Sequence, residues 1–184
     1  MLIVDSDPQG TARDWHNAKP DDAALPAVVG SDRPTLHKDL PGLGQPYDFV
    51  LVDGAARLED MSASALKAAD VVLIPIQPSG YDLWAAAELV EMIQARQLLT
   101  DGKPRAAFVV SRQIQGSHLA GEMSDALETM GLPLLKARTT QRVAYPEAGQ
   151  MGLTVLDLYP DSKAAQEVEA LTSELLELLN DDQA

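Results

Sequence analysis

The chain contains no cysteine, which excludes disulfide bonds, thiolate metal sites and cysteine nucleophiles. Histidine is also scarce: His16, His37 and His118 stand at spacings that match no metal-binding motif, and we expect all of them to be polar surface residues. The sequence has no glycine-serine nucleophile elbow and no paired glutamates of the glycosidase type. Hydrolase chemistry based on these residues is therefore not indicated.

Positive charge and long apolar runs are lacking too. The chain carries 14 Lys and Arg against 28 Asp and Glu, and its net charge of -14 argues against a globally basic nucleic-acid-binding protein. No apolar run approaches the ~20 residues of a membrane span. The amino terminus turns acidic at Asp5, unlike a signal peptide. We expect a soluble cytoplasmic protein, and the 184 residues predict a single domain, 1–184.

The basic residues that do occur are unevenly spread along the chain. A group of them precedes an acidic carboxy-terminal stretch that runs from Asp157 to Asp182. One interpretation is a local basic face on an acidic protein, and the other is ordinary solvated side chains. The group consists of Lys103, Arg105, Arg112, Lys136, Arg138 and Arg142.

Short apolar runs alternate with helical patterns along the chain. The runs predict strands at about 1–4, 26–29, 48–53, 71–76, 105–111 and 132–137. Helices are predicted near 36–40, from Ser62 or Ser64 to 69, at 82–99 with Asp82 as cap, at 117–131, and at 161–179 with Asp161 as cap. The rest of 11–46 is predicted to be mostly irregular. This order predicts an α/β fold, a doubly wound and mainly parallel sheet with helices on both faces.

The long helix at 82–99 shows an apolar stripe that includes Val90, Ile93 and Leu98. Trp84 lies near its start, and core packing is the favoured interpretation over a contact role.

Acidic residues follow two of the predicted strands. Asp5 and Asp7 come directly after the first strand, and Asp53 ends the strand at 48–53. A single aspartate at such a place commonly caps the following turn. Together the aspartates favour a Mg²⁺ or phosphate site, because ligands of open α/β sheets gather at the carboxyl ends of the strands.

The same residues carry a family resemblance. Asp5–Gly10 reads D-S-D-P-Q-G and resembles the D-x-D-P-Q-G switch of ParA/MinD-type partition ATPases, and Tyr47–Asp53 resembles their Walker B strand. The similarity continues through Ala69–Pro78 and ends in Asp161–Ala165 with the helix that follows, so it spans nearly the whole chain. Within the family the chain is most similar to the small plasmid ParA/ParF-like proteins.

The resemblance implies a P-loop NTPase-like fold and roles for particular residues. Asp53 would hold Mg²⁺ through water, Asp5 would support the metal shell, and Asp7 would position or activate the hydrolytic water. Pro8, Gln9 and Gly10 would form the switch that responds to the γ-phosphate, and 54–56 would form a second switch. Further residues would contact the nucleotide around its adenine, and these are Arg112, Thr140 and Arg142.

The resemblance also implies partners. The complete protein would hydrolyse ATP with Mg²⁺, form a homodimer, bind a centromere-binding partner protein and bind DNA non-specifically on the nucleoid, in plasmid or chromosome partitioning. One departure is severe: the family opens with a strand and a Gly-Gly-x-Gly-Lys-Thr loop, whereas this chain begins at the second strand. Its only glycine-lysine step, Gly102-Lys103, is predicted to be a turn. We therefore expect an amino-terminally incomplete domain that binds nucleotide poorly by itself.

Other interpretations remain. A response-regulator-like receiver domain would also place acids at strand ends and a Lys-Pro step near Lys103-Pro104, although that step would follow a strand rather than precede one. A small-molecule amide ligase of the same superfamily would need catalytic groups that nothing here marks. A degenerate, non-catalytic ParA-like scaffold would account for the missing loop.

Overall fold

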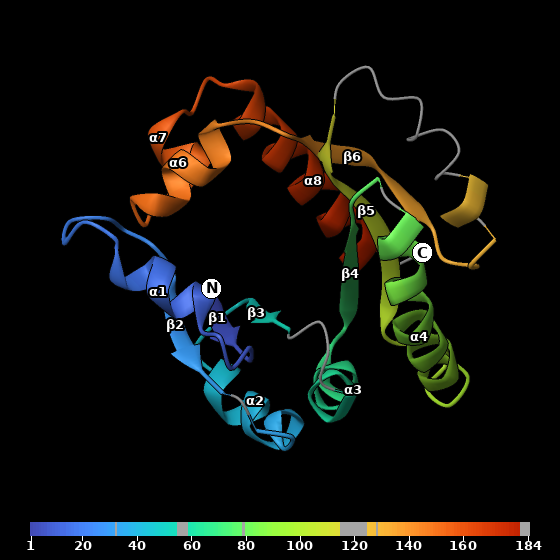
Figure 1. Ribbon diagram of the computed structural model, residues 1–184. Coiled ribbons are helices and arrows are strands. Elements are labelled where there is room, and N and C mark those ends of the chain that lie inside the picture. Colours follow the sequence, from blue (N-terminus) through green and yellow to red (C-terminus); the bar gives the residue numbers. More distant parts are fainter. Residues whose placement is uncertain (32, 55–58, 79, 115–124, 128, 181–184) are drawn as a thin grey trace. The chain divides into compact units, whose positions relative to one another are not determined.

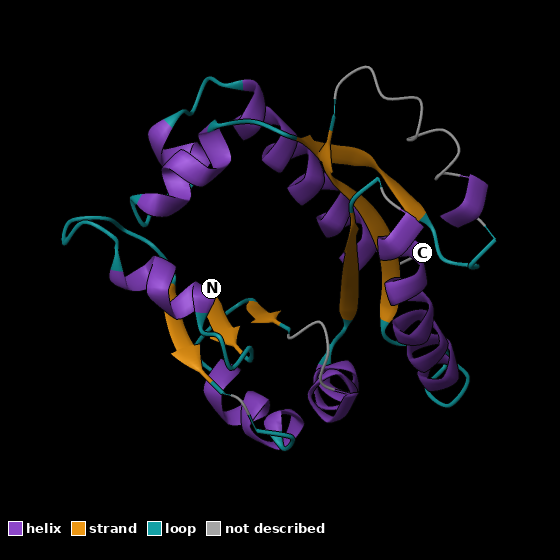
Figure 2. Ribbon diagram, in the orientation of Figure 1, coloured by secondary structure: helices purple, strands orange, loops and turns teal. Residues whose placement is uncertain are grey.

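The computed structural model describes every residue of the chain apart from 32, 55–58, 79, 115–124, 128 and 181–184. It divides into two compact units, Met1–Ala68 with Tyr145–Leu158, and Ala69–Ala144 with Tyr159–Ala184. Each unit contains one three-stranded parallel sheet (Figures 1 and 2). None of the described helices is long and apolar enough to cross a bilayer.

The sheet of the first unit has the strand order β2-β1-β3. Its strands are β1 (Leu2–Asp5), β2 (Ala27–Gly30) and β3 (Val50–Asp53). All four residues of β1 are buried, as expected for the central strand of a parallel sheet. The register pairs Leu2 with Val50 and Asp5 with Asp53, so β1 and β3 end level with each other.

The helices of the first unit are α1 (Thr11–Asn17), α2 (Leu36–Gly44), α3 (Glu59–Ala68), α6 (Ala144–Gln150) and α7 (Val155–Leu158). The helices α2 and α3 pack together, and α1 packs beside β1 and β2. The core of this unit is formed by the fully buried Leu36 of α2 against Leu2 and Val4 of β1. Apolar side chains therefore tie the sheet to its neighbouring helices.

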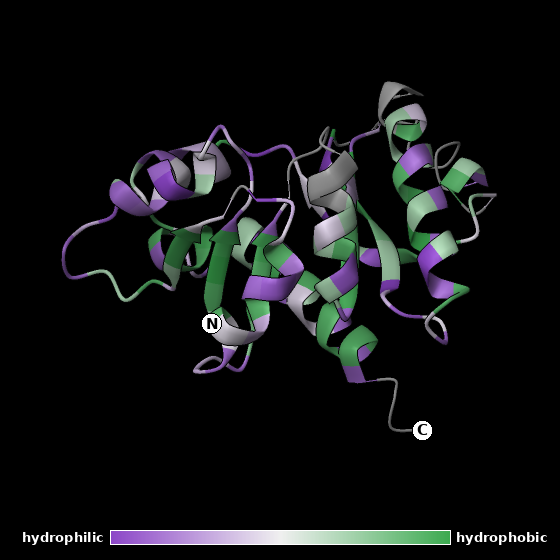
Figure 3. Ribbon diagram, turned by 90° about the horizontal axis from the view of Figure 1, so that it is seen from below, coloured by the Kyte–Doolittle hydropathy of each residue, from purple (hydrophilic) through white to green (hydrophobic). Residues whose placement is uncertain are grey.

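The second unit is built around β5 (Arg105–Gln113), with β4 (Val71–Ile76) and β6 (Leu134–Thr140) on either side. A continuous buried run, Ala106–Val110, makes β5 the centre of this sheet. Its helices are α4 (Gly80–Gln97) and α8 (Lys163–Asn180), and α8 packs against β6. Hydrophobic residues dominate the strands in Figure 3.

The predicted α/β class with parallel strands is confirmed, and each predicted strand is present within a few residues. The prediction of a mostly irregular segment at 11–46 is wrong at 11–17, where α1 forms. Gly10, in the left-handed conformation at φ 72°, redirects the chain into that helix, and Trp15 Nε1 donates to the Leu153 carbonyl at 3.0 Å. The helices α6 and α7 were not predicted either.

Several predicted helix starts also need correction. The helix α4 begins at Gly80, which places Asp82 in its first turn rather than at its cap. In front of α8 the capping oxygen belongs to Ser162, whose Oγ accepts from the Ala165 amide at 3.2 Å, and not to Asp161. The helix α3 starts at Glu59, ahead of the two serines proposed as caps. The predicted helix at 117–131 falls largely outside the described residues.

Three side chains, Trp84, Leu98 and His37, lie in surroundings that differ from their predicted ones. Trp84 is 75% exposed and Leu98 is 88% exposed, so neither packs in the core. His37 is half-buried rather than a surface residue: its Nδ1 lies 2.9 Å from the Oγ of the buried Ser64, which also accepts from the His37 amide at 3.1 Å. This pair joins α2 to α3.

Candidate metal site at the strand ends

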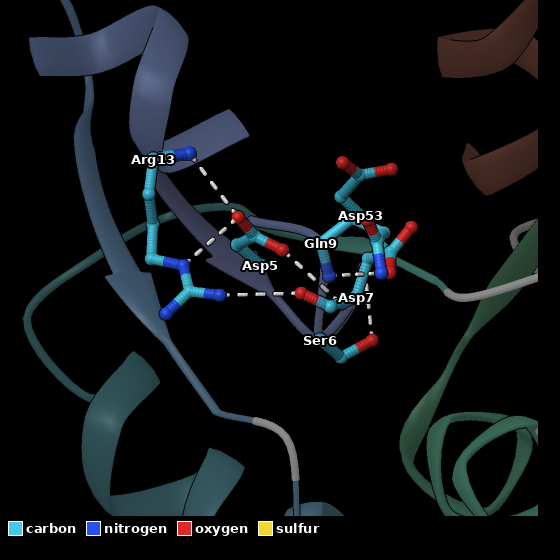
Figure 4. Close-up of polar contacts among 6 residues, drawn as sticks. All are labelled: Asp5, Ser6, Asp7, Gln9, Arg13 and Asp53. Atoms are coloured by element: carbon cyan, nitrogen blue, oxygen red, sulfur yellow. Dashed lines mark hydrogen bonds and ion pairs between the residues drawn. The ribbon is translucent and has the colours of Figure 1, made fainter. Parts of the chain in front are cut away.

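The acids predicted to share an edge of the sheet do so. Asp5 and Asp53 are paired in register at the carboxyl ends of neighbouring parallel strands, and Asp7 follows two residues after Asp5 (Figure 4). The Ser6 amide and Oγ both donate to the Asp53 carbonyl, at 3.0 and 2.8 Å. These bonds extend the ladder by one residue and hold the two strand ends together.

Asp5 is fully buried, and both of its oxygens are engaged by the protein. Its Oδ1 accepts from the Asp7 amide at 3.1 Å, while Oδ2 accepts from the Arg13 amide at 3.1 Å and from Arg13 Nε at 3.2 Å. A buried carboxylate is tolerated only when it is paired and hydrogen-bonded, and Asp5 meets both conditions. Its contacts make it the anchor of the turn that carries Asp7.

Arg13 is a residue of this site that no sequence pattern indicates. In addition to Asp5, its guanidinium bonds the Asp7 carbonyl through Nη2 at 3.2 Å. It lies in a slot between two glycines, because a Cβ on Gly10 would come within 2.7 Å of Nη2 and a Cβ on Gly30 within 3.0 Å of Nη1. Arg13 belongs to no motif of its own, and its role follows from how α1 packs on the sheet.

The turn after β1 fixes the place of Asp7. Its Oδ1 accepts from the Gln9 amide at 2.9 Å, and its carbonyl accepts from the Gly10 amide at 3.0 Å. Gly10, with φ +72°, adopts a conformation that side-chain-bearing residues rarely take. The predicted switch residues Pro8, Gln9 and Gly10 thus form the tight turn into α1.

Asp53 is the acid of this edge whose pKa is raised. Burial raises the pKa of Asp53 above its usual 3.8, and the nearby charges of Asp5 and Asp7 raise this pKa further. Arg13 compensates Asp5, but its contacts reach neither carboxylate oxygen of Asp53. A cation beside Asp53 would relieve this repulsion.

The donor set fits Mg²⁺ in its usual protein coordination. Mg²⁺ takes one or two carboxylates and fills the rest of its octahedron with waters and phosphate oxygens. Asp53, with Asp7 beside it, supplies such a pair, while both oxygens of Asp5 are already bonded to protein groups. Across the residues described, no group of three or more His, Asp or Glu side chains is arranged to hold a metal by itself. An all-protein metal cage is therefore absent from that part of the chain.

The residues predicted to contact adenine lie in the second unit, at the carboxyl ends of β5 and β6. The Arg112 amide donates to Thr139 Oγ1 at 3.2 Å, and Arg112 has φ 55°. Thr140 Oγ1 and Arg142 Nη2 both donate to Glu167 Oε1, at 2.8 and 2.7 Å. Glu167 of α8 therefore brings Thr140 and Arg142 together and compensates the charge of Arg142.

The other predicted basic residues are only partly grouped. Lys136 and Arg138 are exposed and alternate along β6, which places both on the same side of that strand. Arg138 also bonds the Lys136 carbonyl through Nε at 3.3 Å. Arg142 is drawn to Glu167 instead. Lys103 follows Gly102 (φ +83°) in the turn before β5, as predicted for this glycine-lysine step.

Comparison with known proteins agrees with these features. A family model described as "AAA domain" matches residues 21–103. The maintenance of carboxysome distribution protein A of Halothiobacillus neapolitanus is 32% identical over 95% of this chain and 82% of that protein. The protein of the same name from Gloeobacter kilaueensis is 30% identical over 99% of this chain and 81% of its own length. Protein ParA of Rhizobium radiobacter is 25% identical over 83% of this chain and 69% of that protein.

Solved structures share the fold at lower identity. The ATP complex of a Cyanothece McdA variant matches with a TM-score of 0.69 at 17% identity, over 93% of this chain and 84% of that one. The septum site-determining protein MinD of Pyrococcus horikoshii, complexed with Mg-ADP, also matches with a TM-score of 0.69, at 21% identity over 97% of this chain and 84% of that one. At these identities the likeness establishes the fold.

Proposed function

This chain belongs to the ParA/MinD family of ATPases, and from that premise we propose that it is the core of an ATP-dependent machine that positions a cellular cargo. The observation that carries the proposal is the acidic edge of the first sheet, where Asp53 faces Asp5 in register and the turn after β1 presents Asp7. This edge would combine an acid that holds a metal with a second acid on a tight turn that positions water, two of the parts that phosphoryl transfer to water uses.

Each acid is assigned a separate task. Mg²⁺, when bound, would neutralise the phosphate charge that develops during transfer. Asp53 would hold the metal through water, since burial and neighbouring carboxylates leave it short of positive charge. Asp5, bonded to Arg13, would support the metal shell by fixing the turn, and Asp7 would orient the attacking water. Gln9 and Gly10 would move with Asp7, because their amides bond it directly.

Nucleotide and partner contacts complete the proposal. In the second unit, Arg112, Thr140 and Arg142 would contact the nucleotide base, with Glu167 holding the latter two in place. In the complete protein a homodimer and an activating partner protein are proposed by resemblance to the family. The cargo would be a protein body of the carboxysome kind or a DNA molecule, as the names of the related carboxysome-distribution and ParA proteins suggest. The protein body is favoured over DNA as the cargo, because the carboxysome-distribution relatives match a larger share of this chain than the ParA relative does.

Non-specific DNA would serve as the track for this movement. Lys136 and Arg138, both exposed on β6, are the proposed phosphate contacts. Arg142 contributes less than its place in the sequence predicts, since Glu167 neutralises it. Binding through such a patch would fall steeply with salt and ignore base sequence.

The first experiment tests whether this chain can bind the phosphates of ATP. A carboxylate edge repels ATP unless backbone N–H groups and a lysine compensate, and the printed sequence contains no Gly-x4-Gly-Lys-Ser/Thr loop. We expect the chain as printed to bind Mg-ATP with a dissociation constant weaker than about 100 μM, by calorimetric titration. Micromolar binding would mean that another cradle exists.

The functional test adds the phosphate-binding loop of the family to the chain. A strand ending in Gly-Gly-x-Gly-Lys-Thr is fused before Met1, and ATP hydrolysis is measured with and without Mg²⁺. We expect Mg²⁺-dependent hydrolysis that Asp7→Ala slows at least tenfold with little loss of ATP binding, since water positioning acts in the transition state. Tight ATP binding without hydrolysis would instead favour the non-catalytic scaffold. Failure to bind ATP at all would contradict the proposed nucleotide site.

A further inference from the structure

Two aspartate-glycine steps occur in the chain, Asp53-Gly54 and Asp101-Gly102. In such a step the glycine nitrogen can attack the preceding side-chain carboxyl group. Closing a five-membered ring holds the two groups together, and glycine has no Cβ to hinder the approach. All four residues are exposed, so water reaches both steps. Exposure therefore does not distinguish the two steps, whereas their hydrogen bonds do.

In the turn before β5 the nitrogen that would attack is already engaged. The Gly102 amide donates to the Gln97 carbonyl at 3.0 Å, and the next amide, that of Lys103, donates to the Thr100 carbonyl at 3.2 Å. A nitrogen whose hydrogen is held by a carbonyl must give up that bond before it can attack. The turn therefore opposes the reaction at Asp101.

At the end of β3 the corresponding nitrogen has no such bond. The Asp53 carbonyl accepts from the Ser6 amide and Oγ, at 3.0 and 2.8 Å, and so faces β1 (Figure 4). A trans peptide points its N–H opposite to its carbonyl, which directs the Gly54 amide away from β1. Among the described residues this amide has no acceptor, and a Cβ on Gly54 would meet no atom within 4 Å beyond its chain neighbours. The nucleophile is thus available in open surroundings.

We propose that Asp53-Gly54 is a site of spontaneous aspartate isomerisation through a cyclic succinimide, and that it reacts faster than Asp101-Gly102. First a bond forms between Gly54 N and Asp53 Cγ, and one carboxyl oxygen leaves as water with the amide proton and a proton from solvent. Water then opens the ring. Cleavage of the new bond returns aspartate, whereas cleavage at the former Asp53 carbonyl gives isoaspartate, whose chain runs through Cγ. The reaction needs no oxidant and no reactant other than water.

The product lacks the side-chain carboxylate of Asp53. In isoaspartate the free carboxylate is the former main-chain carbonyl group, the one that Ser6 bonds, and the backbone is longer by one methylene. Loss of a cation site through this change rests on the proposed function, but the isomerisation itself does not. Ser6 slows the reaction, because ring closure turns the Asp53 carbonyl about the Cα–C bond and out of both Ser6 bonds.

The test follows isoaspartate in the whole chain during long incubation in warm, neutral buffer. Proteolytic peptides are separated, and isoaspartate is located by enzymatic methyl transfer to its carboxylate and by electron-transfer fragmentation. We expect isoaspartate to accumulate at Asp53 at least threefold faster than at Asp101. In denaturant the two steps should react within about twofold of each other, because the hydrogen bonds that distinguish them are then lost.

Variants test the nucleophile and the bonds from Ser6 separately. Gly54→Ala should slow isomerisation at Asp53 at least tenfold, since a methyl group hinders the nitrogen. Ser6→Ala should speed it at least threefold without raising the rate at Asp101. Ser162→Ala, which removes the serine that bonds the first turn of α8, is the matched control and should change neither rate by more than about twofold. Equal rates at the two steps of the folded protein, a faster rate at Asp101, or an unchanged rate in Ser6→Ala would overturn the proposal.

Discussion

At the scale of single residues, the acidic strand ends are held in place by one arginine that no motif announces. Arg13 satisfies the buried Asp5 and bonds the carbonyl of Asp7, and two glycines leave the space that its guanidinium fills. Among the described residues no basic side chain pairs with Asp53, and its pKa is raised. The negative charge that a bound metal would compensate is therefore that of Asp53, the residue proposed to hold it.

This imbalance predicts how stability changes with pH at Asp53. Because its pKa in the folded state lies above the usual 3.8, the folded protein keeps a proton there that the unfolded chain has already released. Stability from this group therefore falls as the pH rises from about 3.8 through the raised pKa, and stays lower at neutral pH. Asp53→Asn removes this loss, so the variant should be the more stable protein at pH 7 and lose its advantage near pH 3.

Urea unfolding of the two proteins across this pH range measures the difference. Mg²⁺ should then raise the unfolding midpoint of the wild type more than that of the asparagine variant, because only the carboxylate attracts the cation. A variant less stable than the wild type at neutral pH would show that Asp53 already has a favourable partner.

At the scale of elements, close packing of one backbone segment on another decides which glycines can be replaced by a larger residue. The sequence alone does not reveal these positions. A Cβ on Gly152 would lie 2.2 Å from the Lys19 amide nitrogen, and the residue has φ +65°. Gly149, in the same region, has nothing within 4 Å of such a Cβ and belongs to α6. Gly152→Ala should cost roughly 3 kcal/mol of unfolding free energy, through overlap and strain.

Gly149→Ala is its matched control and should be neutral or stabilising by up to about 1 kcal/mol, since alanine favours a helix. Denaturant unfolding of both variants decides the matter. Similar free-energy changes for the two substitutions would mean that α1 and the turn after α6 do not approach as described.

The helix α8 docks on the edge strand β6 through a carboxylate. Glu174 accepts from the Lys136 and Ala137 amides, at 2.8 Å each, and so covers backbone donors that an edge strand would otherwise expose. Glu174→Ala should cost about 2 kcal/mol, in line with hydrogen bonds to a charged group, and should speed hydrogen exchange at these two amides. Glu177→Ala, on an exposed side of α8, should change neither quantity. Unchanged exchange in the first variant would remove Glu174 from this role.

The elements also show which features a sequence reveals. Apolar runs such as Val71–Ile76 predicted the strands well, because burial in a parallel sheet imposes a local signature. The helix α1 was not predicted. Its start depends on the left-handed conformation of Gly10, and its position depends on the hydrogen bond from Trp15 to the Leu153 carbonyl. Trp84 was wrongly assigned to the core for a related reason: helical spacing alone does not say which apolar side chain faces inward.

At the scale of the whole molecule, the sheet of the first unit carries exposed apolar residues at and just before β3. In the described part of the chain β3 pairs only with β1 and β4 only with β5. Phe49 and Leu51 are each 51% exposed, although strands of parallel sheets are normally covered on both faces. The shared edge of Asp5, Asp7 and Asp53 was predicted from the sequence, because strand ends in a parallel sheet lie level.

At this edge Asp53 is proposed to hold a hard cation, with Asp7 close by on the turn after β1. Mn²⁺ takes the same oxygen ligands as Mg²⁺ and broadens the NMR signals of nearby amides. Titrating Mn²⁺ into the chain should selectively broaden the amide signals of Ser6, Asp7, Gln9 and Asp53, excess Mg²⁺ should restore them, and Asp53→Asn should abolish the effect. Broadening that is centred elsewhere, or that persists unchanged in Asp53→Asn, would contradict the account.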